Sequence, residues 1–160
     1  METMASQLRR HYAGQGMDTP LMVGIHTGGV WVAQRLHALL QLPEPLGTLD
    51  IAFYRDDFTR IGLNPVVRPS SLPVSPEGRH VLLVDDVLYT GRTVRAALNQ
   101  IFDYARPASV CLVALVDRGG RELPIEPQIT GLRVDLPLHR HIKLTGPDPL
   151  VLVIHPDTPR

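Results

Sequence analysis

Short aliphatic runs alternate along this chain with segments that have the spacing of amphipathic helices. The runs are LMVGI, TLDIAFY, HVLLV and SVCLVALV, and the helical segments are VWVAQRLHALL and TVRAALNQIFDY. Most of the runs are apolar at successive positions, as strands covered on both faces must be, whereas the second helical segment has one apolar stripe. This alternation predicts an α/β protein with a parallel central sheet flanked by helices.

Length and composition further restrict the expected number of domains and the kinds of partner. With 160 residues, 44% of them hydrophobic, the chain is expected to form one domain. Its 16 basic and 16 acidic residues balance, so any contact with RNA must come from a local group of residues. The single cysteine, Cys111, lies in an apolar run and favours a buried thiol in a cytoplasmic protein, and no apolar stretch predicts a signal peptide or a membrane span.

Two segments depart from the alternation. Residues 55–79 contain four prolines and are too long for a simple connection, so they predict either a short hairpin or a mobile lid over a site. The later segment HIKLTGPDPLVLVIH predicts a hairpin. Trp31, in the first helical segment, is expected to lie in the core.

The strongest candidates for ligand-binding residues lie in VLLVDDVLYTGRT, Val81 to Thr93. Asp85 and Asp86 follow the aliphatic run and are expected at the carboxyl end of a parallel strand, where such sheets bind ligands. Thr90 to Thr93 then open a helix, whose unpaired N–H groups and dipole favour a phosphate. Carboxylates beside a phosphate cradle predict a ligand with both hydroxyls and a phosphate, such as a ribose 5-phosphate.

Other interpretations of these residues are weaker. Adjacent acids at a strand end are often helix caps or solvated loop residues, but here strand, acids, glycine turn and helix all agree. A Walker-type nucleotide site needs Gly-Lys-Ser/Thr, and the only lysine, Lys143, has no such context. GIHTGGV does not supply the G-x-G-x-x-G pattern of a dinucleotide site.

VLLVDDVLYTGRT resembles the phosphoribosyl pyrophosphate (PRPP) motif of type I phosphoribosyltransferases, and in this form it resembles the PyrR family of pyrimidine operon regulators with uracil phosphoribosyltransferase activity. GIHTGGVWVAQRL, LDIAFYRDD and ALVDRGGRELPI also look like segments of that family. The resemblance implies the type I phosphoribosyltransferase fold over residues 1–160, with a core at about 20–120, a flexible loop at about 55–79 and a C-terminal hood at about 121–160. It also implies Mg²⁺ bound with PRPP and a homodimer or larger assembly.

The resemblance assigns roles to individual residues. Asp85 and Asp86 match the ribose-binding acids and Arg55 matches a position near the departing pyrophosphate, so these three are the implied catalytic residues. No metal ligand is assigned directly, and contact of Asp85 and Asp86 with the metal through water stays open. Arg55 is equally well explained as a surface arginine paired with Asp56 or Asp57. The PRPP-binding set implied by the family comprises Thr27, Gly28, Gly29, Asp85, Asp86, Val87, Leu88, Tyr89, Thr90, Gly91, Arg92 and Thr93.

The base side is implied to be Arg118 and Val134. Tyr89 stands where purine-type relatives carry an acid, and a phenol with a pKa near 10 is a poor base at neutral pH, which favours a pyrimidine. Tyr89 is also explained as a packing residue without a role. The hood has RVDLP where the family has Asn-Val/Ile-Pro-Thr-Ser, so the base contacts diverge there.

Three functions remain open from the sequence. The first is a uracil phosphoribosyltransferase that makes UMP and pyrophosphate; the second is an RNA-binding regulator that senses UMP in the same pocket; the third is a binding module with neither activity. The intact PRPP residues favour the first over the third. Gly120, Glu126 and Leu132 replace cationic positions of the family's RNA-binding face, which predicts weak binding of the messenger RNA leader through the remaining Arg121, Arg133 and Arg140.

Overall fold

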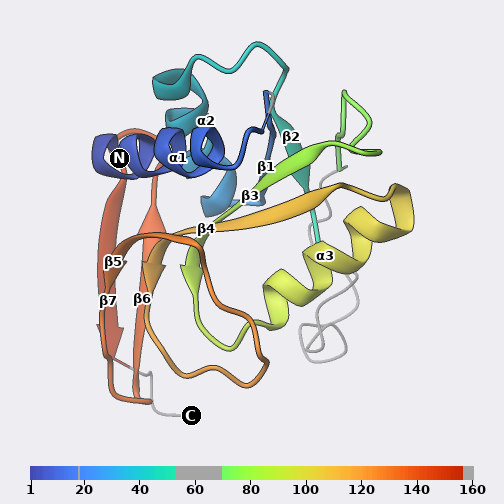
Figure 1. The fold of residues 1–160 in the computed structure, drawn as a ribbon. Coiled ribbons are helices and arrows are strands. Elements are labelled where there is room, and N and C mark those ends of the chain that lie inside the picture. Colours follow the sequence, from blue (N-terminus) through green and yellow to red (C-terminus); the bar gives the residue numbers. More distant parts are fainter. Residues whose placement is uncertain (18, 53–69, 157–160) are drawn as a thin grey trace.

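The computed structural model describes residues 1–17, 19–52 and 70–156, and its centre is a five-stranded parallel sheet (Figure 1). The strand order is β2-β1-β3-β4-β5, and every neighbouring pair is parallel. The strands are β1 (Leu21–Ile25), β2 (Gly47–Leu49), β3 (His80–Leu88), β4 (Ser109–Asp117) and β5 (Ile129–Arg133). The predicted α/β class with a parallel sheet is confirmed.

Helices cover both faces of this sheet. Helices α1 (Glu2–Gly14) and α2 (Gly28–Leu40) pack on one face, and α3 (Arg92–Tyr104) packs on the other (Figure 1). Alternate residues of β3 divide between the two cores: Leu82 and Val84 pack with α1 and α2, whereas Leu83 packs with α3. Cys111 of β4 is 4% exposed in the first core. Burial on both faces accounts for the unbroken aliphatic runs.

Strand β3 is longer than its aliphatic run predicts. The aliphatic run stops at Val84 and the acids were expected at the carboxyl end of the strand, but pairing with β4 continues to the partners Leu88 and Asp117. Both strands have nine residues, so the ladder of hydrogen bonds extends past the acids. Asp85 and Asp86 therefore lie inside the carboxyl-terminal half of a rigid strand.

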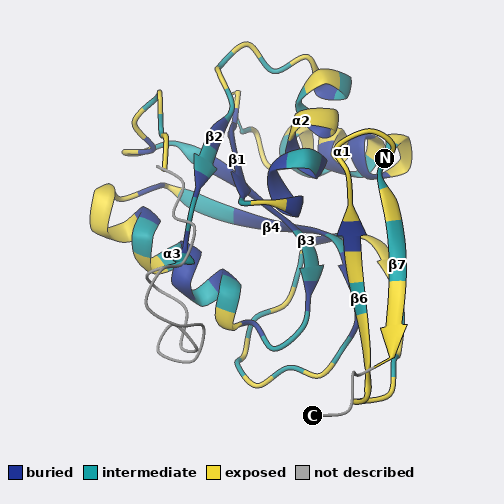
Figure 2. Cartoon of the chain, turned by 180° about the vertical axis from the view of Figure 1, so that it is seen from behind, coloured by how far each residue is buried: buried dark blue, intermediate teal, exposed yellow. Residues whose placement is uncertain are grey.

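The predicted C-terminal hairpin is present as β6 (Arg140–Thr145) and β7 (Val151–Pro156), which pair antiparallel. Leu144 is 4% exposed and joins the core beneath α1 and α2. The turn of the hairpin packs on α2, because a Cβ at Gly146 would lie 2.9 Å from Cε3 of Trp31. Much of the opposite side of the hairpin is exposed (Figure 2).

Most of the predicted loop at residues 55–79 lies outside the described residues. Where the chain is described again, Ser71 exchanges two backbone hydrogen bonds with Thr48 of edge strand β2, at 2.7 and 2.8 Å. No helix of the described ranges combines the length and apolar character needed to cross a membrane.

Candidate active site

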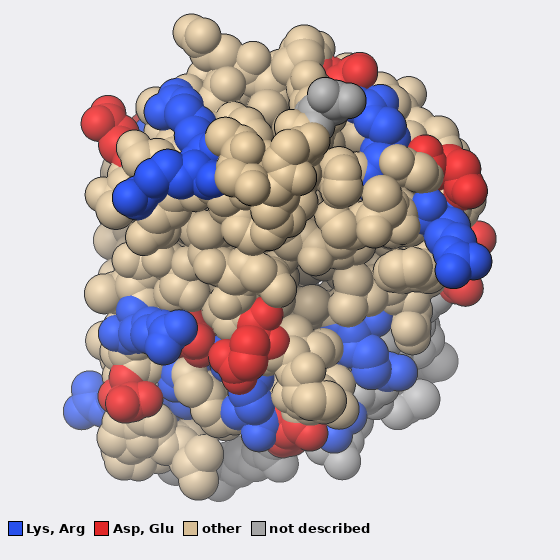
Figure 3. Space-filling model, in the orientation of Figure 1, with Lys and Arg blue, Asp and Glu red and all other residues tan. Residues whose placement is uncertain are grey.

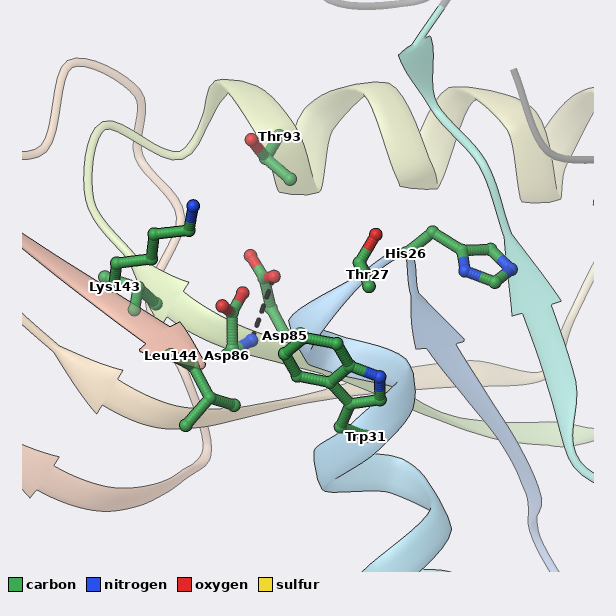
Figure 4. Close-up of a pocket in the computed structure, with 10 residues that line it drawn as sticks. His26, Thr27, Trp31, Asp85, Asp86, Thr93, Lys143 and Leu144 are labelled. Carbon is green, nitrogen blue, oxygen red and sulfur yellow. Dashed lines mark hydrogen bonds between the residues drawn. The ribbon is translucent and has the colours of Figure 1, made fainter. Parts of the chain in front are cut away.

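A pocket of about 450 Å³ opens where β3, the N-terminus of α2 and β6 meet (Figure 4). Ten described residues line it: His26, Thr27, Gly28, Trp31, Asp85, Asp86, Val87, Thr93, Lys143 and Leu144. The structure thus brings Thr27 and Gly28 of the loop after β1, and Thr93 at the start of α3, to the same pocket as both acids.

The two carboxylates differ in burial. Asp85 is 4% exposed, and its Oδ1 accepts a hydrogen bond of 3.0 Å from the backbone N–H of Asp86. Asp86 is half-buried and lies directly against Gly28, where any side-chain carbon would overlap the Asp86 carboxylate. The absence of a side chain at residue 28 therefore lets the loop after β1 approach the acids closely.

That first loop joins β1 to α2. The backbone N–H of His26 donates to the carbonyl of Leu49 at 2.8 Å, and a cis peptide bond joins His26 to Thr27. Helix α2 then begins at Gly28, so its first N–H groups, which have no acceptor within the helix, lie beside the pocket. Such groups favour an anion.

The second loop joins β3 to α3. Gly91 has a φ of 92°, in the left-handed region, and α3 begins at the next residue. The N–H of Arg92 donates to Oγ1 of Thr90 at 3.2 Å, and the carbonyl of Thr90 accepts hydrogen bonds from the N–H groups of Glu122 and Leu123. The segment after β4 therefore holds the loop in place.

An aromatic ring and a guanidinium stack directly after β3 and β4, and neither Tyr89 nor Arg118 is among the residues that line the pocket. The Arg118 guanidinium carbon lies 3.8 Å from the centroid of the Tyr89 ring, and Arg118 is only 5% exposed. Its Nε is buried and has no hydrogen-bond partner among the described residues. The Tyr89 ring also fills the space that a side chain at residue 120 would need, because a Cβ at Gly120 would overlap the ring.

Other predicted residues take backbone or core positions. The N–H of Val134 donates to the carbonyl of Asp117 at 2.9 Å, which places Val134 near Arg118 but outside the pocket lining. Leu88 is 1% exposed and packs with α3, so only its backbone can face a ligand. Arg55 lies outside the described residues.

Asp117 and Arg121 form a network next to Arg118. Nη2 of Arg121 donates to Oδ1 of Asp117 at 2.8 Å, and its other nitrogens donate to the carbonyls of Tyr89 and Ile125 at 2.9 and 2.8 Å. Burial by itself raises the pKa of the Asp117 carboxyl, but the hydrogen bonds from Gly119 and Arg121 and the nearby arginine charges together lower that pKa below its ordinary value.

Sequence reasoning missed four pocket residues: His26, Trp31, Lys143 and Leu144. Trp31 is half-buried against the core and also lines the pocket, so the expectation of a core residue describes only part of its position. Lys143 had one available signal, because it is the only lysine of the chain. No pattern in the sequence indicated that the hairpin would fold back onto α2.

Comparison with known proteins agrees with this geometry. Residues 1–136 match the family described as "Phosphoribosyl transferase domain". Among solved structures, a Trypanosoma cruzi hypoxanthine phosphoribosyltransferase superposes with a TM-score of 0.65 at 26% identity, covering 83% of this chain and 71% of that one. A Staphylococcus aureus hypoxanthine phosphoribosyltransferase shares the fold with a TM-score of 0.61 at 20% identity, covering 84% and 73%.

The fold and the two loops facing a pair of acids thus define a phosphoribosyltransferase. More similar sequences specify the family. The "Bifunctional protein PyrR" of Nitrosococcus oceani is 61% identical over 92% of this chain and 84% of that protein, and the same-named protein of Pseudomonas aeruginosa is 58% identical over 93% and 88%. The chain belongs to the PyrR family of phosphoribosyltransferases.

Proposed function

We propose that this protein transfers the phosphoribosyl group of PRPP to uracil, giving UMP and pyrophosphate. One observation carries the proposal: the loop at Thr27–Gly29 and the loop ending at Thr93 meet Asp85 and Asp86 around a single pocket. Two anion-favouring loops beside hydroxyl-accepting carboxylates match a ligand that has a phosphate at one end, a diphosphate at the other and hydroxyls between them.

The chemistry asks the side chains mainly for positioning. Departure of pyrophosphate leaves positive charge on the ribose ring and negative charge on the leaving group. In the proposed mechanism Asp85 and Asp86 accept hydrogen bonds from the ribose hydroxyls, and the N–H groups of residues 90–93 hold the 5′-phosphate. The amides of residues 27–29 bind the diphosphate, and Arg55 adds charge near the leaving group.

Magnesium is proposed to be carried mainly by the substrate. The described residues contain no group of three or more His, Cys, Asp or Glu side chains that could hold a metal. Mg²⁺ prefers oxygen ligands and keeps several waters, so substrate oxygens are proposed to hold it, with Asp85 and Asp86 as the nearest carboxylates. When bound, the ion would neutralise charge on the diphosphate.

Uracil is the proposed acceptor because of the stacked pair Tyr89 and Arg118. Tyr89 has no carboxyl group that could act as a base, and the Arg118 guanidinium offers only hydrogen-bond donors. Uracil presents two carbonyl acceptors, and the buried Nε of Arg118 has no partner among the described residues. The backbone of Val134 lies on the same side.

The decisive assay measures UMP formation from uracil, PRPP and Mg²⁺, with orotate, hypoxanthine and guanine as alternative acceptors. Uracil is expected to be the substrate, and activity confined to a purine would refute the proposal. Changing Asp85 and Asp86 together to Asn keeps their shape and removes their charge, so kcat/KM for PRPP should fall by about 100-fold or more. Asp103→Asn, an exposed change on α3, is the matched control.

A second activity, RNA-dependent regulation, is proposed to be weakened in this chain. The family resemblance places RNA on the segment after Asp117, where Arg121 is one of the remaining cations. That guanidinium is 14% exposed and donates to Asp117, Tyr89 and Ile125, so little of it is available to a phosphate. Glu126 lies 3.3 Å from it and adds negative charge.

We also propose at least a homodimer, on the basis of the family. Sedimentation at micromolar concentration should give twice the chain mass or more, and a monomer would count against this assembly.

A further inference from the structure

Lys143 of β6 places a positive charge in the proposed PRPP pocket. Its side chain extends from the hairpin toward the space bordered by Asp85, Asp86 and Thr93 (Figure 4). Among the described residues that line the pocket, it is the only lysine or arginine. The hairpin follows the PRPP motif, Val81 to Thr93, by more than forty residues in the sequence.

The hairpin holds this lysine in a defined position. The next residue, Leu144, is 4% exposed in the core, which fixes the depth of β6. Lys143 pairs with Val153 in the register of the hairpin. Beyond β6, Gly146 packs on Trp31, and Nη2 of Arg35 reaches the carbonyl of Pro147 at 3.4 Å. Adjacent residues of a strand point to opposite faces, so burial of Leu144 directs Lys143 away from the core.

The ammonium group is not engaged inside the protein. Lys143 makes no hydrogen bond or ion pair with any described residue, although two carboxylates line the same pocket. PRPP carries phosphate at both ends of the sugar, so it brings several negative charges to a pocket that already contains two acids. Helix N-termini supply only partial charge, about half an elementary charge each. A full positive charge at the wall of the pocket would attract such a ligand, in addition to the charge of Mg²⁺ and Arg55.

We propose that Lys143 binds a phosphate group of the phosphoribosyl ligand. This inference rests on the proposed function, and it adds the C-terminal hairpin to the two loops as a third phosphate-binding element. The phosphate concerned is either the 5′-phosphate, which PRPP and UMP share, or the diphosphate, which PRPP shares with pyrophosphate. Binding of UMP therefore reports on the 5′-phosphate, and binding of pyrophosphate reports on the diphosphate.

The test compares Lys143→Met and Lys143→Arg with the native protein. The matched control is Arg10→Met, which removes one exposed cation from α1, a helix that contributes no residue to the lining of the pocket. Calorimetry measures the binding of Mg-PRPP, UMP and Mg-pyrophosphate separately, and steady-state assays measure KM for PRPP and for uracil. Thermal unfolding of each variant checks that the fold is retained.

Loss of a charged hydrogen bond should weaken PRPP binding by about 10-fold to 100-fold in Lys143→Met, with partial rescue in Lys143→Arg. Parallel weakening of UMP binding assigns the 5′-phosphate, and parallel weakening of pyrophosphate binding assigns the diphosphate. KM for uracil should stay within about 2-fold, since no phosphate of that substrate is involved.

Native affinity for all three ligands in Lys143→Met would overturn the inference, as would an equal loss in Arg10→Met. Failure of the proposed function has a different signature, because the native protein would then form no UMP. The calorimetric comparison does not depend on turnover and still decides whether Lys143 binds phosphate.

Discussion

The Tyr89 ring occupies space that exists because residue 120 has no side chain. One face of the ring carries the Arg118 guanidinium at 3.8 Å, and a Cβ at Gly120 would overlap Cε2 of the ring. The family resemblance implies a cationic residue where this chain has Gly120. The loss of a cation at this position is thus coupled to the position of an aromatic ring next to the proposed base site.

Two adjacent glycines allow this contact to be measured. Gly119 and Gly120 both have positive φ, at 70° and 77°, so alanine at either should cost about 1–2 kcal/mol of unfolding free energy from backbone strain. Only Gly120→Ala also meets the Tyr89 ring, and overpacking should add about 1–3 kcal/mol. Urea unfolding of both variants checks this difference, and it should disappear in a Tyr89→Ala background. Equal losses in the native background would contradict the contact.

The Asp117 carboxyl predicts a pH dependence of stability. Its pKa in the folded state lies below the ordinary value of 3.8, so its contribution is present above that value and is lost as pH falls through the lowered folded pKa. Asp117→Asn should lower the unfolding free energy by about 1.5–3 kcal/mol near pH 7, because the hydrogen bond from Arg121 loses its charged acceptor. The difference from the native protein should shrink in denaturation curves recorded below pH 4.

A stability difference that stays constant from neutral to acidic pH would show that Asp117 does not titrate in this way. Asp103→Asn is the control, since that exposed residue of α3 makes no comparable contact.

Among the helices and strands, sequence patterns predicted the elements whose formation depends mainly on their own residues. The runs at β1, β3 and β4 have aliphatic residues on both faces, and α2 and α3 have clear apolar stripes, so all five elements were predictable. The Thr-Gly-Arg-Thr turn also identified the start of α3, because Gly91 needs a positive φ there. Both acids and the loop before α3 were therefore available from local patterns, whereas the loop at residues 27–29 was implied only by the family resemblance.

Elements that depend on distant partners were not predictable. Helix α1 buries only Met4, Ala5 and Leu8, and β5 has a single buried residue, so neither has a strong periodic signal. Lys143 enters the pocket because the hairpin packs on α2, which is a contact between segments more than a hundred residues apart in the sequence. Periodicity contains no information on such packing.

The packing of the hairpin turn on α2 gives a prediction about these two elements. Gly146→Ala places a methyl group against Trp31 and Leu150, so it should destabilise the hairpin, lower the unfolding free energy by about 1–3 kcal/mol and raise KM for PRPP. Gly14→Ala is the matched control, because nothing lies within 4 Å of a Cβ at that position. Unchanged stability and KM in Gly146→Ala would mean that the packing of the turn is adaptable.

At the scale of the whole molecule, the distribution of surface charge bears on RNA binding. On the face shown in Figure 3, groups of Lys and Arg atoms are separated by Asp and Glu atoms and by uncharged surface. This agrees with the formal net charge of zero. A polyanion binds through a continuous group of cations, so this distribution favours a small, mobile phosphate ligand over a long RNA.

We therefore expect weak binding of the pyrimidine operon leader RNA at about 0.15 M salt, with a shallow dependence on salt concentration. Glu126→Arg should strengthen binding and steepen the salt slope, because it removes a repulsion and adds a phosphate contact. Glu2→Arg makes the same change of charge on α1 and should do less. Filter binding with and without UMP measures both. Tight, UMP-strengthened binding that Glu126→Arg leaves unchanged would place RNA on another face.

The burial of Cys111 has a practical consequence. It is the only thiol of the chain, it is 4% exposed in β4, and burial raises its pKa to about 11. The native fold therefore holds almost no reactive thiolate near neutral pH. A cysteine that replaces the exposed His155 of β7 would be labelled selectively by a maleimide dye, and the native Cys111 could stay in place. Fluorescence from that single dye could then follow the hairpin as PRPP binds.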